Sequence, residues 1–453
     1  MVVVGASLAG VRAAEALRAE GFDGELTLVG EENRPPYDRP PLSKGVLLGR
    51  IDPGDTGLPA RRAVDARWLL GVRAEALDPD RARLRLSDGG QLPYDRLLIA
   101  TGTRARDWPH PDEAALDGVL ALRTADDAAV LTRLLAAGPG RVLVIGAGFT
   151  GSEIASACRE RGLPVTVVER GPAPLIGALG GVCGSFAAAL QRAHGVDLRC
   201  GTTVTRLLGD GGRLTGAELS DGDRIAADVA VVALGAVRNT EWLQGSGLAA
   251  GPRGLACDAG CRAFDRHGVV TDDIFVAGDV ARFPHPLYAF QLLSLEHWGN
   301  AVAQAETAAH NMVTRGPRRL PHLTLPAFWS SQFGVNIKSV GVPTFSDQVV
   351  LAQGSLAARR LVAVYGYRGR ITAAVAVNRA KALEYYQDLI ENRAPFPPGP
   401  GAADAPFATV AVPSDMPDPR RLSHGPTVAV TGHVLDRYGT TGPGGPAADL
   451  DPT

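Results

Sequence analysis

Two glycine-rich turns, each preceded by an apolar strand and followed by a helical pattern, constrain the fold of this chain more than any other feature. The first occupies residues 5–10 (GASLAG) after a run of valines, and the second occupies residues 146–151 (GAGFTG) after RVLVI. In dinucleotide-binding folds such a turn places a helix N-terminus against a pyrophosphate. The sequence therefore predicts two nucleotide cradles in one polypeptide.

The first cradle has the residue sizes that this turn needs. Gly5 permits the tight turn, Ser7 lets the backbone approach a pyrophosphate, and Gly10 lets the helix pack on the strand. Ser7 stands where the fingerprint usually has its middle glycine, so this motif alone is only moderately specific. Glu31 follows the next predicted strand and is expected to accept hydrogen bonds from ribose hydroxyls.

The second cradle matches the fingerprint at each position, with Gly146, Gly148 and Gly151 between a strand and a helix. Glu169 closes the strand that follows the helix. Its charge favours NADH over NADPH, because it repels the additional 2′-phosphate. Arg170, directly after it, weakens that preference. We expect NADH at this cradle.

Motifs at the ends of three other predicted strands indicate which nucleotide each cradle binds. The stretch TDDIFVAGD ends in Asp279, a pattern that places an acid against the ribityl chain of a flavin, and LLIATGT carries its usual companion, Thr101 and Gly102. The strand ADVAVVALG ends the second unit at Gly235. Together these motifs predict bound FAD in the first cradle and a diffusing nicotinamide nucleotide in the second.

Composition excludes several other functions. The chain has 453 residues, 45% hydrophobic residues and a formal net charge of -2. It has no basic tract for nucleic acid and no apolar run of the ~20 residues that span a bilayer. It begins with a strand rather than a basic leader, which indicates a cytoplasmic protein.

The cysteines do not indicate a disulfide framework or a metal site. There are five, an odd number, and they are scattered along the chain. Cys257 and Cys261, with His267 nearby, match no common zinc spacing. We expect these two to be ordinary thiols and expect no metal.

On these motifs the chain resembles the FAD-dependent NAD(P)H reductases of the ferredoxin, rubredoxin and putidaredoxin reductase type. The resemblance covers residues ~1–390, within the glutathione-reductase-like fold that has two dinucleotide domains. Besides the cradles, it is carried by PPYDRPPLSKGVL, LLIATGTRAR, RNTEWLQGSGL, VAGDVARFPHPL, EHWGNAVAQAE and FWSSQFGVNIKSVG.

The resemblance implies an α/β protein with two Rossmann-like domains, the FAD domain being split around an inserted NAD domain. A small α+β C-terminal domain follows. A tail rich in Pro and Gly is expected to be disordered, with room for a short docking strand in FATVAV or PTVAV. The expected segments are FAD domain 1–107 and 237–319, NAD(P)H domain 108–236, C-terminal interface domain 320–393 and tail 394–453.

The resemblance also implies a catalytic pair. Lys44 of PPLSK is expected near flavin N5 and in contact with Glu153 of the second cradle's helix. Such a pair is chemically sensible, since a cation beside N5 stabilises negative charge on the reduced flavin and a carboxylate keeps the lysine protonated.

Further site residues follow from the same resemblance. Arg39, Arg123 and Asp279 are expected along the FAD chain, and Ala9 at the pyrophosphate turn. In the EHW motif, Glu296 and Trp298 are expected to border the nicotinamide slot. The backbone after Glu296, at His297, is expected near the flavin pyrimidine ring.

Two residues and one stretch depart from the family pattern. Ser331 stands where an acid is usual, Arg238 where a proline is common, and the approach AFQLLSLEHW is more apolar than expected. Ser331 and this apolar run are expected where an electron acceptor reaches the flavin. They bear on the identity of the acceptor more than on the flavin chemistry.

The predicted function is hydride transfer from NADH to FAD, then single-electron transfer to a [2Fe–2S] ferredoxin serving a cytochrome P450 or a dioxygenase. Disulfide reductases of the same fold need a CxxxxC pair on the helix of the FAD domain that stacks on the flavin. Here RPPLSK occupies that region, and no cysteine precedes Cys158. Two alternatives stay open. One is a flavoenzyme acting directly on a small organic molecule, and the other is an NADH-switched protein of the apoptosis-inducing-factor type.

Overall fold

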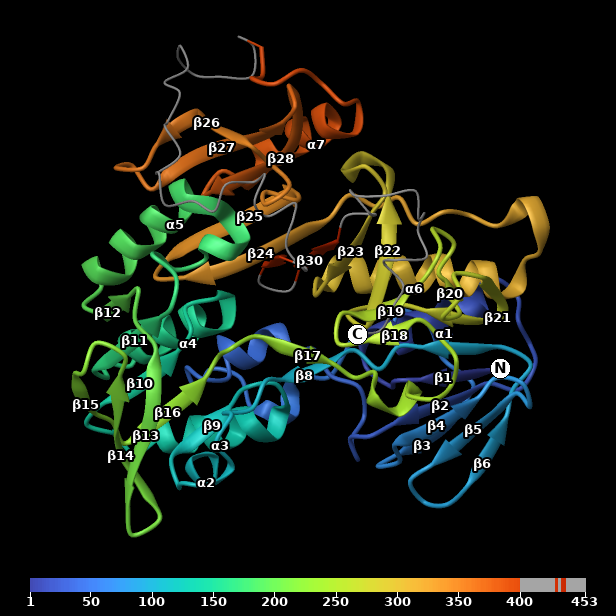
Figure 1. Cartoon of the computed structure of the whole chain (residues 1–453), viewed down its shortest axis with the longest axis horizontal. Coiled ribbons are helices and arrows are strands. Elements are labelled where there is room, and N and C mark those ends of the chain that lie inside the picture. Colours follow the sequence, from blue (N-terminus) through green and yellow to red (C-terminus); the bar gives the residue numbers. More distant parts are fainter. Residues whose placement is uncertain (400–427, 431–432, 437–453) are drawn as a thin grey trace.

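The computed structural model describes residues 1–399, 428–430 and 433–436. Two parallel sheets lie side by side, and an antiparallel C-terminal sheet packs over them, drawn in orange in Figure 1. Within this described part, no helix is long and apolar enough to cross a membrane.

The first parallel sheet joins strands from both ends of the nucleotide-binding region. Helices α1 (Leu8–Ala19) and α6 (Trp298–Val313) pack together on one face, where Val3 and Leu28 are fully buried. The small sheet β4 (Ala74–Asp78), β5 (Arg83–Leu86) and β6 (Gln91–Pro93) packs on the other face. The strands, in sheet order, are β20 (Arg262–Phe264), β21 (Val270–Val276), β7 (Leu97–Ile99), β1 (Val2–Val4), β2 (Thr27–Gly30) and β3 (Arg67–Leu70). All neighbours are parallel except the edge strand β20, which runs antiparallel to β21.

The second parallel sheet repeats this plan. Helices on one face are α3 (Ala125–Ala136), α4 (Phe149–Glu160) and α5 (Ile176–Ala193). The other face is covered by α2 (Pro111–Ala114) and by β13 (Val204–Asp210), β14 (Arg213–Leu219) and β15 (Arg224–Ala226). The strands, in sheet order, are β12 (Asp197–Cys200), β11 (Val165–Glu169), β10 (Val142–Ile145), β16 (Val229–Val232) and β9 (Val119–Ala121).

The chain crosses between the two sheets twice, and the two crossings pair with each other. Strand β8 (Thr103–Ala105) leaves the first unit, β17 (Ala236–Arg238) returns to it, and they run antiparallel with Thr103 opposite Arg238. This ribbon holds the two cradles on the same side of the molecule.

The apolar run before the EHW motif contains a strand of a mixed sheet. It contains β18 (Ala250–Gly251), β19 (Gly254–Ala256), β22 (Ala281–His285) and β23 (Gln291–Leu295). Each residue of β23 is buried, so this part of the run offers no surface to a partner, contrary to the expectation. Ala289 and Phe290, at the start of the run, are exposed. The apolar side chains of β23 fill the sheet interior.

Two short strands of the C-terminal region add to this mixed sheet. Strand β30 (His433–Asp436) pairs antiparallel with β23, and β29 (Val428–Val430) pairs with β30. Thus β29 lies in the PTVAV run that was expected to leave room for a docking strand. The FATVAV run and most of the predicted disordered tail lie outside the described residues.

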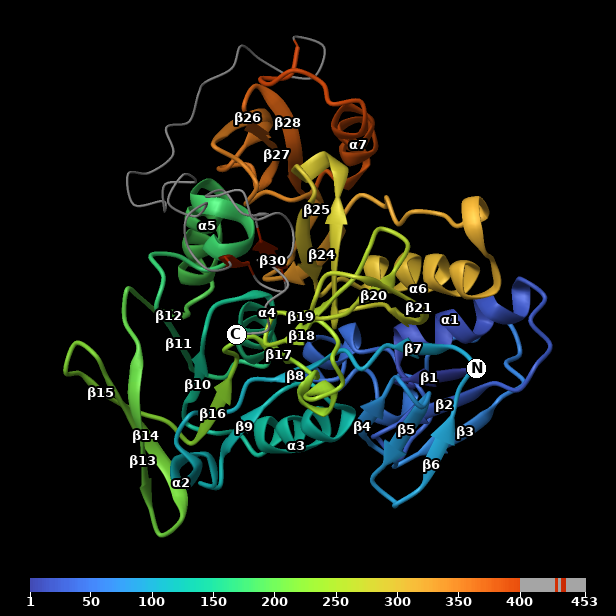
Figure 2. The same cartoon turned by 45° about the vertical axis from the view of Figure 1, so that its right-hand side comes forward.

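The C-terminal sheet is antiparallel and begins at an edge strand beside α4. Phe328 on that strand lies 4.6 Å from Phe149 of α4 between ring centroids. Tyr365 donates a hydrogen bond to the carbonyl of Leu179 in α5, and both Figures 1 and 2 show this sheet against α5. Its elements are β24 (Ala327–Gln332), β25 (Val335–Gly341), β26 (Gln348–Ser355), β27 (Arg360–Tyr367), β28 (Arg370–Val377) and helix α7 (Leu383–Glu391).

The five cysteines are free thiols, and four of them are buried. Burial raises the pKa of the Cys257 and Cys261 thiols, which disfavours the reactive thiolate. Both residues therefore behave as the ordinary thiols that the sequence predicts.

Candidate nucleotide and redox site

A cavity of about 1180 Å³ opens where the carboxyl ends of β1, β2, β7 and β21 meet. In open parallel sheets, this edge is where ligands bind. The cavity is also lined by Phe149 and Glu153 from the second unit and by Phe328 and Trp329 from the C-terminal sheet. All three parts of the protein therefore contribute to one space.

The first cradle forms one end of this cavity. A Cβ atom at Gly5 would lie 2.1 Å from the carbonyl oxygen of Ala100, and one at Gly10 would lie 1.8 Å from the oxygen of Gly5. Ser7 is the N-cap of α1, but its side chain makes no capping hydrogen bond. The first N–H groups of α1 are therefore left for an anionic ligand, as a pyrophosphate requires. Ala9 also lines the cavity.

The second cradle has the same backbone geometry. A Cβ atom at Gly146 would lie 2.5 Å from the carbonyl oxygen of Ala233, and one at Gly151 would lie 2.0 Å from the oxygen of Gly146. Gly148 is the N-cap of α4. Gly235 has φ +85°, in the left-handed region, with open space where a Cβ would stand. There glycine serves the backbone conformation rather than a close approach.

The two acids predicted to bind ribose differ in their surroundings. Glu169 accepts hydrogen bonds from the backbone N–H groups of Ala147 at 2.7 Å and Gly171 at 2.6 Å. Carboxylate oxygens carry further lone pairs, so it remains able to accept from hydroxyls. The Glu31 side chain is 66% exposed at the cavity rim, and its carboxylate lies 3.6 Å from the Arg73 guanidinium.

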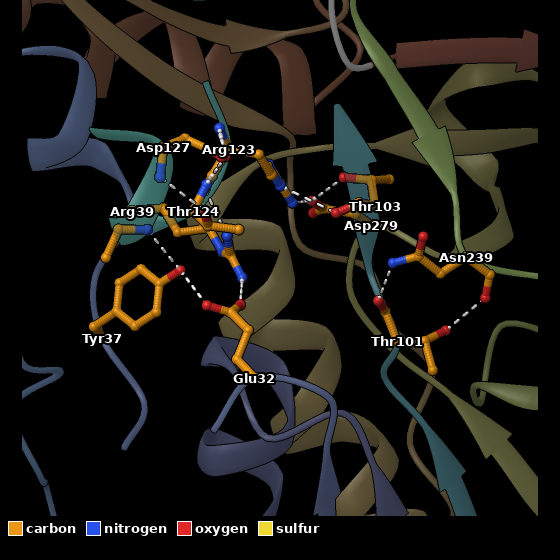
Figure 3. A network of polar contacts seen from close by, with 11 residues as sticks. Glu32, Tyr37, Arg39, Thr101, Thr103, Arg123, Thr124, Asp127, Asn239 and Asp279 are labelled. Carbon is orange, nitrogen blue, oxygen red and sulfur yellow. Dashed lines mark hydrogen bonds and ion pairs between the residues drawn. The ribbon is translucent and has the colours of Figure 1, made fainter. Parts of the chain in front are cut away.

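Figure 3 shows a polar network on the wall of the first unit that contains two predicted FAD contacts, Arg39 and Arg123. Arg39 donates to the carbonyl of Arg123 and to the carboxylate of Glu32, both at 2.6 Å. Tyr37 donates to Glu32 at 2.6 Å and accepts from the N–H of Ala125 at 3.1 Å. Burial raises the pKa of Tyr37 to about 12, so it remains a donor.

Glu32 was not predicted from the sequence, where only the first acid of the pair 31–32 was considered. Its two partners, Tyr37 and Arg39, lie in the proline-rich stretch that follows. Polar residues alternate with prolines in this stretch, and that pattern is the sequence signal that could have pointed to a polar partner such as Glu32. This network ties the loop after β2 to the start of α3.

The network continues to the predicted acid of the AGD motif. Arg123 donates to Asp279 at 3.1 Å and to the carbonyl of Thr103 at 3.0 Å, and the Thr103 hydroxyl donates to Asp279 at 3.3 Å. Asp279 lines the cavity with a side chain 17% exposed. A partly buried acid with donors already on one oxygen is suited to accept hydroxyl groups of a ligand chain.

Thr101 and Gly102 lie on the same wall, beside the second crossing of the chain. The Thr101 hydroxyl donates to the carbonyl of Asn239 at 2.9 Å, and Asn239 Nδ2 donates back to the carbonyl of Thr101 at 2.8 Å. The carbonyl of Gly102 accepts from the N–H of Asn239 at 3.1 Å. Asn239, which no sequence motif marks, therefore fixes this part of the cavity.

The predicted pair of Lys44 and Glu153 is present. Lys44 Nζ lies 2.7 Å from a carboxylate oxygen of Glu153, and both residues line the cavity. The Lys44 side chain is 27% exposed and that of Glu153 is 6% exposed. The pair thus places a fixed cation at the boundary between the two cradles.

Glu296 forms an ion pair with Arg238, the residue that departs from the family pattern. The Arg238 guanidinium lies 3.1 Å from the Glu296 carboxylate, and the Arg238 side chain is 7% exposed. Burial raises the pKa of Glu296, and the positive charge of Arg238 opposes that rise. Arg238 therefore acts as the counter-ion of a buried acid.

His297 and Trp298 begin helix α6 at the cavity. The buried ring of His297, the N-cap, lies 5.1 Å from the ring of Phe328. Trp298 donates its indole N–H to Asp38 at 2.8 Å and lies 6.2 Å from the ring of Trp329 in an edge-to-face arrangement. Asp38, also missed in the sequence, orients the Trp298 indole on the cavity wall.

Comparisons with known proteins agree with this architecture. A family model described as pyridine nucleotide-disulphide oxidoreductase matches residues 1–305, and one described as reductase C-terminal matches residues 327–408.

Two curated relatives match nearly their whole length. The ferredoxin--NAD(+) reductase component of an anthranilate 1,2-dioxygenase system from Burkholderia cepacia is 36% identical, covering 95% of this chain and 98% of the relative. Rhodocoxin reductase from Rhodococcus erythropolis is 35% identical, covering 90% of this chain and 92% of the relative. The crystal structure of a covalent putidaredoxin reductase–putidaredoxin complex contains a chain that superimposes with a TM-score of 0.80 at 31% identity, covering 87% of this chain and 93% of that one.

Proposed function

Because this chain belongs to the pyridine nucleotide-disulphide oxidoreductase family, we propose that it is an NADH-dependent, FAD-containing ferredoxin reductase. It oxidises NADH and delivers single electrons to a [2Fe–2S] ferredoxin or a similar small redox protein. That carrier serves a cytochrome P450 or a ring-hydroxylating dioxygenase. A cytoplasmic location is part of the proposal, because NADH is supplied there.

The observation that carries the proposal is that both cradles contribute to one cavity. The residues present fit FAD: the glycines of the first cradle leave no room for a Cβ, uncapped N–H groups begin α1, and Asp279 lies on the wall. When bound, FAD supplies the conversion of one hydride into two single electrons. Phe149 and Glu153, from the helix of the second cradle, line the same space.

The residues of this chain provide orientation and charge. The Lys44 ammonium, held by Glu153, stabilises negative charge that develops beside it in a site that is partly shielded from solvent. Trp298, oriented by Asp38, forms a flat wall against which an aromatic ring can lie. Glu296 also lines the cavity, and the buried Arg238 is its counter-ion.

Disulfide chemistry, which the family description includes, is not supported in this chain. No cysteine precedes Cys158, so the N-terminal part of the first unit holds no dithiol. Cys257 and Cys261, in the later part of that unit, are fully buried, and burial raises the pKa of both thiols. Burial raises the pKa of Cys158 to about 12, which keeps this thiol protonated and unreactive.

The choice of electron acceptor is supported by the relatives. The Burkholderia cepacia relative is named as a ferredoxin--NAD(+) reductase component, and the putidaredoxin reductase is solved with putidaredoxin. This chain spans nearly the full length of both. A protein carrier therefore explains the resemblance better than a small organic acceptor.

NADH-driven reduction of cytochrome c, with and without a panel of [2Fe–2S] ferredoxins, tests the proposal. Strong stimulation by at least one ferredoxin is expected. Repeating the assay with NADPH is expected to give a lower rate, because Glu169 stands at the second cradle.

Other outcomes would favour the alternatives. Rapid flavin reduction without any ferredoxin effect would indicate a flavoenzyme that acts on a small organic molecule. A long-lived complex of reduced flavin with NAD and very slow turnover would indicate an NADH-switched protein. Absence of flavin reduction would contradict both enzyme assignments.

A further inference from the structure

Glu153 is a buried carboxylate at which three parts of the molecule meet. The residue lies on α4 of the second unit, while Ser43 and Lys44 end the short 3₁₀ helix Pro40–Ser43 of the first unit. Oxygen Oε2 of Glu153 accepts from Lys44 Nζ at 2.7 Å and from the Ser43 hydroxyl. Oxygen Oε1 accepts from the hydroxyl of Ser330, on β24 of the C-terminal sheet, at 2.6 Å.

The direction of the Ser330 hydrogen bond is fixed by its neighbours. Gln332 Nε2 donates to Ser330 Oγ at 3.2 Å, so the single hydroxyl proton of Ser330 is left for another acceptor. An ionised carboxylate can only accept. Ser330 therefore donates to Glu153, and its side chain, 1% exposed, has no water to replace that partner.

The strand that carries Ser330 is firmly seated on α4. The rings of Phe328 and Phe149 lie 4.6 Å apart, and the N–H of Phe333 donates to the Ser156 hydroxyl at 2.7 Å. The Ser330 hydroxyl is thus held by backbone and aromatic contacts on both sides. A donor fixed in this way limits rotation of the Glu153 carboxylate.

The two oxygens of Glu153 have different tasks. Oε2 holds the Lys44 ammonium, and Oε1 is held by Ser330. Without the Ser330 hydroxyl, a buried charged oxygen loses its donor, which costs more than the hydrogen bond itself is worth. The carboxylate then gains by turning toward other donors, and the ammonium loses its fixed position.

We propose that Ser330 is a positioning residue for hydride transfer, whose hydroxyl holds Glu153 so that this carboxylate keeps the Lys44 ammonium at the cavity wall. Ser330 itself does not line the cavity, so it acts only through Glu153. The inference rests on the proposed function and assigns part of its chemistry to the C-terminal sheet.

The test is Ser330→Ala in the FAD-loaded protein. The reduction rate at saturating NADH, measured by anaerobic stopped flow, is expected to fall about tenfold, the effect of one hydrogen bond to a charged group. The midpoint potential of the flavin is expected to fall by about 30 mV, which is a tenfold change for two electrons. The potential falls because a less firmly held ammonium stabilises the reduced form less.

Three matched variants separate positioning from packing. Ser339→Ala removes an equally buried hydroxyl from β25, one that makes no hydrogen bond within the described residues, and is expected to change neither quantity. Ser330→Thr keeps the hydroxyl and is expected to restore both. In a Lys44→Ala background, Ser330→Ala is expected to have no further effect, because both changes act through the same ammonium.

The outcomes distinguish this inference from the proposed function. If NADH does not reduce the flavin of the unchanged protein, the proposed function itself fails. If it does, and Ser330→Ala keeps the original rate and potential, the positioning role is overturned. An equal loss with and without Lys44 overturns it as well. Should Ser330→Ala not retain FAD, Ser330→Cys, a weaker donor of similar size, is expected to shift both quantities in the same direction by less.

Discussion

The two nucleotide cradles share one backbone design and differ in what surrounds them. In each, glycines at the first and last positions leave less than 2.6 Å for a Cβ. The first cradle opens into a cavity walled by loops from four strands, whereas only the start of helix α4 from the second reaches it. We propose that this one design serves a nucleotide that stays in the first cradle and one that exchanges in the second.

The acids beside the cradles differ in the same way. Glu169 is held by two backbone N–H groups, and we propose that they orient it for an incoming ribose. Glu31 is largely exposed, while the neighbouring Glu32 holds Tyr37 and Arg39 in the wall. We infer that retention in the first cradle comes from the whole wall, and that selection in the second depends on one acid.

The largest expected effect comes from adding a methyl group to either cradle. Gly10→Ala places a Cβ 1.8 Å from a carbonyl oxygen and is expected to abolish FAD retention. Gly151→Ala meets the equivalent contact at 2.0 Å and is expected to keep FAD but weaken NADH binding at least about tenfold, since overpacking costs roughly 1–3 kcal/mol. The flavin content of each purified variant measures FAD retention, and titration with NADH measures NADH affinity.

Gly57→Ala is the control for these variants, because open space surrounds the position of its Cβ. It is expected to retain FAD and NADH affinity. Loss of FAD from Gly151→Ala with retention in Gly10→Ala would reverse the assignment of the cradles.

A smaller effect is expected from the two acids. Glu169→Ala is expected to lower the preference for NADH over NADPH about tenfold. The variant loses the carboxylate that accepts hydrogen bonds from the ribose of NADH and that repels the 2′-phosphate of NADPH. Glu31→Ala is expected to change FAD affinity by less than about twofold, because exposed charges contribute little. Steady-state kinetics with both nucleotides and FAD titration of the apoprotein test this pair. A larger effect at Glu31 than at Glu169 would contradict the comparison.

Acid is expected to destabilise the first unit before the second. Burial lowers the pKa of His285 to about 4 and of His322 to about 3. The unfolded chain binds these protons below about pH 6.5 and the folded chain does not, so stability falls as pH drops from there toward 4, by roughly 1.4 kcal/mol per histidine and pH unit. Glu296, whose pKa is raised by burial, opposes this trend in part.

The second parallel sheet and its helices contain no comparable histidine within the described residues, because His110 is exposed and His194 is half-buried. Calorimetry is therefore expected to show that, between about pH 7 and pH 5, the unfolding transition that releases the flavin moves to lower temperature before the transition of the second unit does. His322→Asn is expected to weaken this shift. An unchanged acid response in that variant would contradict the assignment to the buried histidines.

The two cradles and the acids beside them could be predicted from local sequence. The glycine turns, the acids at strand ends and the AGD motif each act through neighbours that are close along the chain. The contact between Lys44 and Glu153, 109 positions apart, was predicted only through the family resemblance.

The other site residues could not be predicted, because their contacts join segments that are far apart in the chain. Ser330 and Glu153 are 177 positions apart, and Trp298 and Asp38 are 260 apart. Arg238 was read as a departure from the family, yet it pairs with Glu296. The apolar run before the EHW motif is predicted where a partner reaches the flavin, whereas its central residues form a buried strand, because pairing in the mixed sheet cannot be derived from composition.

Anaerobic addition of NADH to the FAD-loaded protein and to its Gly151→Ala variant tests whether NADH acts from the second cradle. In the unchanged protein, the oxidised-flavin absorbance is expected to disappear completely, at a rate that saturates with NADH concentration. In the variant, saturation is expected to require a higher NADH concentration, while the flavin content stays the same. Identical saturation in both proteins would show that NADH does not act from the second cradle.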